Sequence, residues 1–223
     1  MTTRRTLALL LAFAGAGLAL AIPTFAVAGA NDSNYRYQVT IRNLSRSDLT
    51  PVVWGAHTKK ARLFTPGRKA SPGLEQLAED GLTGPISNEL NRKRGVGASG
   101  VAGRIEAGQR MRFTFTTTKQ RARFSWASMF ACSNDAFAGQ NGIKLPTGKV
   151  GSRVKRQLVP WDAGTERNDE LSSAVPCLGA HGVGPSENRK VRRHPGIKDK
   201  GDLVNARNGW ARYGARITIR RVG

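Results

Sequence analysis

Carboxylate side chains are scarce in this 223-residue chain, which has 15 acidic and 36 basic residues, so their clustering is informative. Asp135 lies just after an apolar run that ends at Phe130, and Asp162 and Glu166 lie in the acidic segment 160–170. Both places are rich in Gly, Pro, Asn and Asp, which is typical of loops. Calcium binds ~6–8 oxygen ligands in flexible geometry. The pattern is compatible with one calcium site built from two loops, but composition alone favours turn residues that pair with nearby arginines.

Catalytic signatures are missing from the sequence. It contains no G-x-S-x-G, H-E-x-x-H, Walker-type or C-x-x-C motif. The histidines His57, His181 and His194 are scattered, and their spacing supports neither a zinc site nor a catalytic triad. We therefore expect a binding protein and no enzyme, with a calcium-using exported hydrolase as a weaker alternative.

The N-terminal segment has the pattern of a secretory signal peptide. Arg4 and Arg5 precede an apolar run over residues 7–22, and small residues follow up to Ala28. This order predicts cleavage after residue 28 and an exported domain over 29–223. The alternative, a membrane anchor, needs a run of ~20 apolar residues. The paired arginines also suggest the twin-arginine export route.

The two cysteines, Cys132 and Cys177, are most simply a disulfide in an exported protein, because that environment is oxidising. Two buried thiols are the alternative, and a catalytic cysteine has no supporting histidine pattern. A disulfide here would fasten the two ends of the segment that contains Asp135, Asp162 and Glu166.

The formal net charge of +21 favours polyanionic partners such as acidic polysaccharide, nucleic acid or an acidic cell surface. It equally serves solubility alone. Candidate contact residues lie on the predicted terminal strands, including Arg42, and in a basic run near residue 190. The residues predicted to contact a polyanion are Arg189, Lys190, Arg192, Arg193, Arg216, Arg220 and Arg221.

Period-two alternation predicts strands over residues 35–42, 111–116 and 215–220, each with one buried face. The continuous apolar run 124–130 predicts a more central strand. The first and last strands share one pattern, apolar inward and basic outward, and we expect them to pair.

Helical signals gather between residues 71 and 91. Ser71 followed by Pro72 is typical of a helix start, and Gly81 ends the apolar spacing. A second short helix is expected over residues 85–90, and a long loop over 179–200. The class predicted is an all-β antiparallel sandwich with short helical insertions.

Several segments together resemble the spondin family, the amino-terminal domain type of F-spondin. Residues 35–44 are similar to its opening strand, and residues 63–72 and 77–81 to the helical segment of exported prokaryotic members. The run 133–139, SNDAFAG, resembles the family's S-P-D-W-F-x-G loop. The run 161–166, WDAGTE, resembles its W-D-A-G-T-D motif, the most specific element.

The resemblance implies an antiparallel β-sandwich similar to calcium-dependent membrane-targeting domains. It implies Asp135, Asp162 and Glu166 as the calcium ligands of this chain. Glu166 replaces the family's aspartate, Asn134 its proline and Ala136 an aromatic residue. Animal members belong to extracellular-matrix and adhesion proteins, some of which bind glycosaminoglycans.

The predicted function is therefore a calcium-binding exported module for a polyanionic, cell-surface or extracellular ligand. The main alternative is an exported binder of nucleic acid or anionic polymer that needs no metal. Such binding would fall steeply with salt. The chain lacks the glycine-aromatic strand motif of common RNA-binding sheets, and specific nucleic-acid recognition is not expected.

Overall fold

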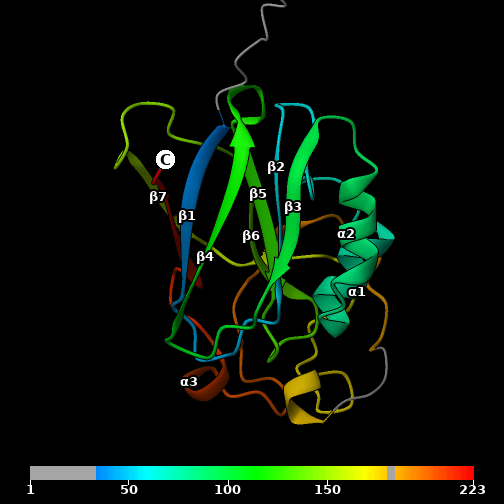
Figure 1. The fold of residues 1–223 in the computed structure, drawn as a ribbon. Coiled ribbons are helices and arrows are strands. Elements are labelled where there is room, and N and C mark those ends of the chain that lie inside the picture. Colours follow the sequence, from blue (N-terminus) through cyan, green and yellow to red (C-terminus); the bar gives the residue numbers. More distant parts are fainter. Residues whose placement is uncertain (1–33, 180–183) are drawn as a thin grey trace, which may run out of the picture. The chain divides into compact units, whose positions relative to one another are not determined.

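The computed structural model describes residues 34–179 and 184–223. The predicted signal peptide and His181 lie outside the described residues. The described part folds into two antiparallel sheets packed as a sandwich, with few short helices (Figure 1). The predicted fold class is confirmed.

A four-stranded sheet forms one layer and contains both terminal strands of the domain. Its order is β4 (Arg110–Thr118), β1 (Asn34–Asn43), β10 (Ala215–Arg221) and β7 (Arg153–Leu158). All three pairings are antiparallel, with Ile41 opposite Ile217 and Met111. The predicted pairing of the first and last strands is confirmed.

A six-stranded sheet forms the second layer. Its order is β3 (Val96–Ala102), β2 (Val52–His57), β5 (Arg123–Met129), β6 (Ala136–Lys144), β8 (Trp161–Asp162) and β9 (Arg192–Arg193). The strand predicted over 124–130 is β5, which lies between β2 and β6 as a central strand. Its continuous apolar run reflects burial on both faces.

Aromatic side chains fill the space between the sheets. Trp54 of β2 stacks on Phe113 and approaches Phe115 of β4, and Tyr37 stacks on Phe115. Phe124 of β5 stacks on the same Phe115. The longer strands, such as β1, β2 and β10, contribute alternate residues to this core, as the period of two requires.

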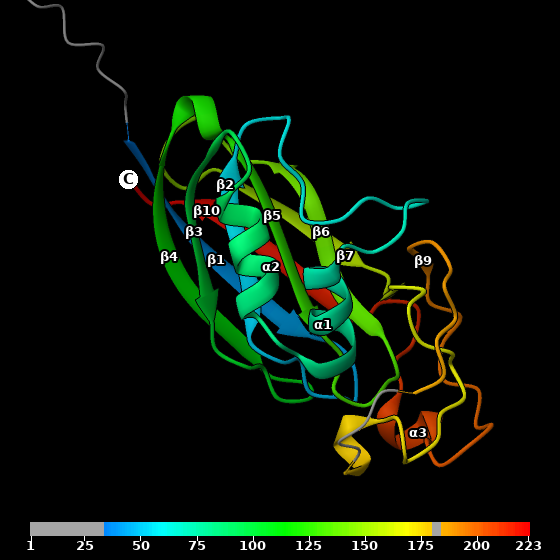
Figure 2. The same ribbon diagram turned by 90° about the vertical axis from the view of Figure 1, so that its right-hand side faces the viewer.

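Two helices cover the other face of the six-stranded sheet. They are α1 (Pro72–Asp80) and α2 (Gly84–Asn91), and they lie on the side away from β1 (Figures 1 and 2). The Ser71 hydroxyl accepts a hydrogen bond from the backbone N–H of Leu74, and Gly81 has a φ of 70° at the end of α1. The predicted N-cap and stop signal are therefore both confirmed.

The remaining helical turns are short. They are η1 (Lys119–Arg121), η2 (Pro176–Leu178) and α3 (Asn205–Asn208). No described helix is long and apolar enough to cross a membrane.

The segment predicted as a long loop over residues 179–200 is irregular over most of its described part. It differs at Arg192 and Arg193, which form β9 and pair with β8. Two residues are too short for a period-two pattern, and both are basic, so nothing in the sequence predicts this strand. The pairing brings the segment after residue 193 onto the edge of the six-stranded sheet.

Cys132 and Cys177 form a disulfide, with their Cα atoms 5.0 Å apart. The backbone N–H of Cys177 also donates to the carbonyl of Ala131. The predicted pairing is confirmed, and the bridge closes a loop with a sequence separation of 45 that contains Asp135, Asp162 and Glu166.

Candidate metal centre

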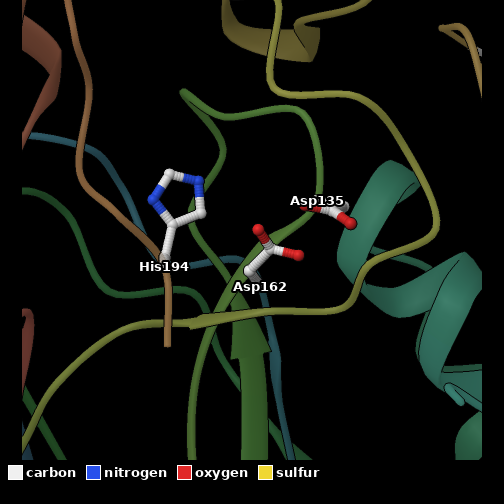
Figure 3. Close-up of side chains that lie close together, drawn as sticks. All are labelled: Asp135, Asp162 and His194. Atoms are coloured by element: carbon white, nitrogen blue, oxygen red, sulfur yellow. The ribbon is translucent and has the colours of Figure 1, made fainter. Parts of the chain in front are cut away.

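The edge formed by β6, β8 and β9 brings Asp135, Asp162 and His194 together (Figure 3). Asp135 immediately precedes β6, Asp162 ends β8, and His194 follows β9. The register places Ala136 opposite Asp162, which in turn lies opposite Arg192. One potential ligand atom from each of the three residues lies within 4.8 Å of the others. Neighbouring strands therefore join residues that are 59 positions apart in the chain, from 135 to 194.

Asp135 is fully buried and held by the loop that follows β8. Its Oδ2 accepts from the backbone N–H groups of Thr165 (2.9 Å) and Glu166 (3.2 Å), and from the Thr165 hydroxyl (3.3 Å). Its Oδ1 is buried and has no hydrogen-bond donor among the described residues.

Asp162 shows the same asymmetry. Its Oδ2 accepts from the Arg192 guanidinium and from the Asn168 amide, both at 2.9 Å. Its Oδ1 is buried without a donor among the residues described. Leaving a buried acceptor without a partner costs about 1–3 kcal/mol. Each carboxylate is thus oriented through one oxygen while the other is left unpaired, and a bound cation would satisfy both.

His194 is held through both ring nitrogens. The backbone N–H of Gly196 donates to Nδ1 at 3.0 Å, so Nδ1 carries no proton. Nε2 then carries the proton and donates to the Asn168 carbonyl oxygen at 2.7 Å. Because Asn168 donates in turn to Asp162, the three side chains form one directed chain. In this arrangement His194 positions Asp162 through Asn168 and presents no free lone pair to an ion.

Burial dominates the protonation of these groups. Burial and, second, the nearby charge of Asp162 raise the pKa of Asp135 to about 7, against the backbone N–H groups that lower it. Burial also raises the pKa of Asp162, while Arg192 opposes that rise. Burial, followed by the charges of Arg192 and Lys198, lowers the pKa of His194 to about 3. The imidazole is therefore neutral at physiological pH.

Glu166 lies beside this group and is not a member of it. Its side chain is buried, and one carboxylate oxygen accepts from the backbone N–H of Gly184. Burial, against the lowering effect of the Gly184 hydrogen bond and together with the charges of Glu79, Asp135 and Asp169, raises the pKa of Glu166 to about 8. The ligand role predicted for Glu166 stays a prediction. The structure shows a third buried carboxylate near the group, close enough for the charge of Asp135 to raise its pKa.

The family model described as Spondin_N matches residues 36–176, which is more than half of the chain. The chain belongs to the spondin family. A search of curated proteins finds no match. The matched segment contains Asp135, Asp162 and Glu166, while His194 and Arg192 lie beyond it. Membership of the spondin family and the disulfide indicate an extracellular protein.

The departures from the spondin motifs have visible structural roles. Asn134 is buried, donates to Asp169 at 3.0 Å and accepts from the backbone N–H of Glu170 at 3.1 Å. A proline offers neither bond, so Asn134 ties the first acidic loop to the second. Ala136 is fully buried in β6 opposite Asp162, in space shared with the core.

Sequence reasoning missed three residues of this spondin site: Asn168, Arg192 and His194. Asn168 lies inside the acidic segment, but an asparagine in a loop is an ordinary turn residue. Arg192 belongs to the predicted polyanion contacts, yet its guanidinium lies 2.9 Å from Asp162 and 2.7 Å from Glu187. Only the unpredicted strand β9 places Arg192 and His194 here.

The other predicted polyanion contacts lie in different surroundings. Arg189 is exposed and pairs with Glu187 at 3.2 Å, and Lys190 is exposed. Arg193 lies over the Trp161 ring. On β10, Arg220 is exposed and Arg216 half-buried.

Arg221 stacks on Tyr35, with its guanidinium carbon 3.8 Å from the ring centroid. It also donates to the carbonyls of Thr147 and Gly148. A polyanion role for these residues stays a prediction. The structure divides them between the six-stranded sheet's edge and the four-stranded sheet.

Proposed function

We propose that this spondin domain is an exported, calcium-binding module that attaches to a polyanionic cell-surface or extracellular ligand, without catalysis. The observation that carries the metal part is the pair of buried, unpartnered oxygens on Asp135 and Asp162. Both belong to the same group of potential ligands.

The chemistry of the donors favours a hard cation. Asp135 and Asp162 offer carboxylate oxygens, and both nitrogens of His194 are engaged by hydrogen bonds. Oxygen ligands with no available nitrogen or sulfur suit calcium better than zinc. Asp135 and Asp162 would hold the ion, and carbonyl or water oxygens would complete its coordination.

A basic protein repels a cation at long range, but the binding site is locally acidic. Salt screens charges beyond ~8–10 Å. Within that distance lie carboxylates that burial makes costly to ionise alone. A divalent ion stabilises their ionised forms, so we infer that calcium binding and the order of these loops are coupled. The ion's role would then be to stabilise the acidic end of the sandwich.

Calcium titration by calorimetry, with thermal melts, tests this proposal on wild type, Asp162→Asn and the matched control Asp80→Asn. Asp80 is exposed at the end of α1 and is not a member of the group. We expect a saturable site in wild type and the control, lost in Asp162→Asn. A ligand at 100 times its Kd stabilises the folded state by about 2.7 kcal/mol.

Absence of binding at millimolar calcium would refute the metal part. Equal binding by all three proteins would place the ion elsewhere. If calcium fails while a sulfated polymer still binds, the domain is the metal-independent polyanion binder that the sequence offers as its alternative.

A further inference from the structure

The outward face of the four-stranded sheet carries only basic and neutral polar side chains. We call this surface the basic sheet face. Its members on β1 and β4 are Arg36, Gln38, Thr40, Arg42, Arg110, Arg112, Thr114 and Thr116, and those on β10 and β7 are Arg216, Thr218, Arg220, Arg153, Lys155 and Gln157. Every residue of these strands is described, and this face includes no carboxylate and no aromatic ring.

The register places like charges directly opposite one another. Arg42 of β1 lies opposite Arg110 of β4 on one side and Arg216 of β10 on the other. Arg220 lies opposite Arg153 of β7. Like charges in directly opposed positions destabilise a sheet. Within the described part of the chain, none of these five arginines has an ion-pair partner.

A hollow of about 290 Å³ opens on this face. It is lined by Thr40, Arg42, Arg110, Arg153, Lys155, Arg216 and Thr218. The Nε of Arg216 is buried there without an acceptor among the described residues. The two threonines sit opposite each other on β1 and β10 and add neutral hydroxyls between the cations. Five cations and two hydroxyls from four strands thus converge on one depression.

We propose that the basic sheet face binds a linear anionic polysaccharide, with one of its charged groups seated in this hollow beside Arg216. The inference rests on the proposed attachment to a polyanion and names its surface and ligand class. Charge complementarity carries it: sulfate or carboxylate groups relieve the repulsion along the row of Arg110, Arg42 and Arg216. Sugar hydroxyls find partners in Thr40 and Thr218.

The composition of the face argues against two other polyanions. Single-stranded nucleic acid is held by aromatic rings on which bases stack, and here the aromatic residues of β1 and β4 point into the core. Peripheral membrane binding that goes beyond charge attraction to anionic lipids uses apolar side chains that enter the interface. The exposed large apolar residues of the described chain all lie outside these four strands.

Asp135, Asp162 and Glu166 form what we call the acidic cluster. Polymer binding to the basic sheet face should not depend on this cluster. The basic sheet face belongs to the four-stranded sheet, whereas Asp135 and Asp162 lie at the edge of the six-stranded sheet. Chelation of calcium is expected to leave polymer affinity unchanged within about twofold, provided the temperature stays below the melting point of the metal-free protein. The two parts of the proposed function can therefore fail separately.

The test compares binding of the purified protein to dextran sulfate, neutral dextran, oligo(dT) and phosphatidylglycerol vesicles at one ionic strength. The variant is Arg42→Gln, Arg110→Gln and Arg153→Gln combined. The matched control, Lys59→Gln, Lys60→Gln and Arg68→Gln combined, removes the same charge from exposed positions in the segment between β2 and α1. We expect the sheet variant to lose about tenfold or more in dextran sulfate affinity and the control to lose less than about threefold.

Other outcomes overturn the inference in distinct ways. Equal losses in the two triple variants would mean that net charge governs binding, and the proposed function would stand without this surface. Tighter binding of oligo(dT) or vesicles than of dextran sulfate would replace the polysaccharide by that partner. Failure of wild type to bind any anionic probe would refute both this inference and the polyanion part of the proposed function. A melting curve for each variant confirms that it is folded.

Discussion

The acidic cluster and the basic sheet face treat charge in opposite ways. Asp135, Asp162 and Glu166 are buried, and backbone N–H groups, Asn168 and Arg192 orient them. The arginines of the sheet face lie near solvent, and the register sets several of them against one another. In the acidic cluster, burial of negative charge destabilises the folded state. On the basic sheet face, repulsion between solvent-exposed positive charges does so.

The comparison teaches that net charge alone describes neither region. The chain has 36 basic residues against 15 acidic ones, so basic partners for the buried carboxylates are abundant. Yet Arg192 is the one described arginine in an ion pair with the central group of Asp135 and Asp162. We infer that each region binds a partner of opposite charge. The acidic cluster binds a cation, and the basic sheet face binds an anionic polymer.

The disulfide offers the largest effect that separates the two regions. Replacing Cys132 and Cys177 by serine removes a bridge that closes the loop containing all three carboxylates. The chain-entropy estimate is a loss of about 4 kcal/mol in the free energy of unfolding. Urea melts measure this loss, and calcium affinity is expected to fall with it.

Dextran sulfate binding supplies the control for the disulfide variant. Because neither cysteine lies on the four-stranded sheet, polymer affinity should be retained while the protein is folded. Loss of polymer affinity together with calcium affinity would show that the two regions are not independent.

Arg192→Gln should show how much the Arg192 guanidinium, which pairs with Asp162, contributes to the stability of the folded protein. The change leaves Asp162 and Glu187 without the guanidinium that lies between them. We expect a loss of about 2 kcal/mol at pH 8 in EDTA, because a buried charge then lacks its partner. Denaturant melts of this variant, with exposed Lys190→Gln as control, measure it. A loss that saturating calcium does not reduce would contradict the placement of the ion.

The pH dependence without calcium should have an unusual sign. The pKa is raised to about 7 for Asp135 and about 8 for Glu166, so the folded state binds more protons than the unfolded state up to these values. Stability therefore falls as the pH rises from 6.5 to 8.5, by about 2–3 kcal/mol. His194 acts in the opposite direction, mainly below its ordinary pKa of 6.5, so it offsets the fall only at the acid edge of this window.

Melts across that pH window in EDTA and in excess calcium check this prediction. Calcium binds the ionised carboxylates, so it should flatten or reverse the slope. If the pH dependence of stability is the same with and without calcium, the ion does not bind the carboxylates that titrate in this window.

What the sequence could predict depended on how far each signal extends along the chain. The paired terminal strands and α1 follow from six or more residues of periodic pattern and from the caps Ser71 and Gly81. Asp135 and Asp162 were predicted because carboxylates are rare and a motif marks them. Arg192 and His194 are not predicted to belong to this site, because β9 has only two residues and its pairing with β8 is a long-range contact.

Only part of the basic sheet face can be predicted from the sequence, because local periodicity does not show which strands are neighbours. Alternation identified Arg42, Arg216 and Arg220 as outward residues on the first and last strands. The neighbours Arg110 and Arg153 belong to the same row only through strand order and register, which local periodicity does not specify.

Arg42→Thr gives the smallest predicted effect and the most direct test of like-charge strain. Arg42 lies opposite both Arg110 and Arg216, whereas the matched control Arg36 lies opposite Thr116 of β4. Threonine suits a strand, so Arg42→Thr should raise the free energy of unfolding by about 0.5 kcal/mol at low salt. Arg36→Thr should change it by less. Because salt screens exposed charges, the difference between the two variants should shrink toward zero near 1 M salt. If Arg42→Thr destabilises the protein at every salt concentration, the row of arginines carries no repulsion for a polyanion to relieve.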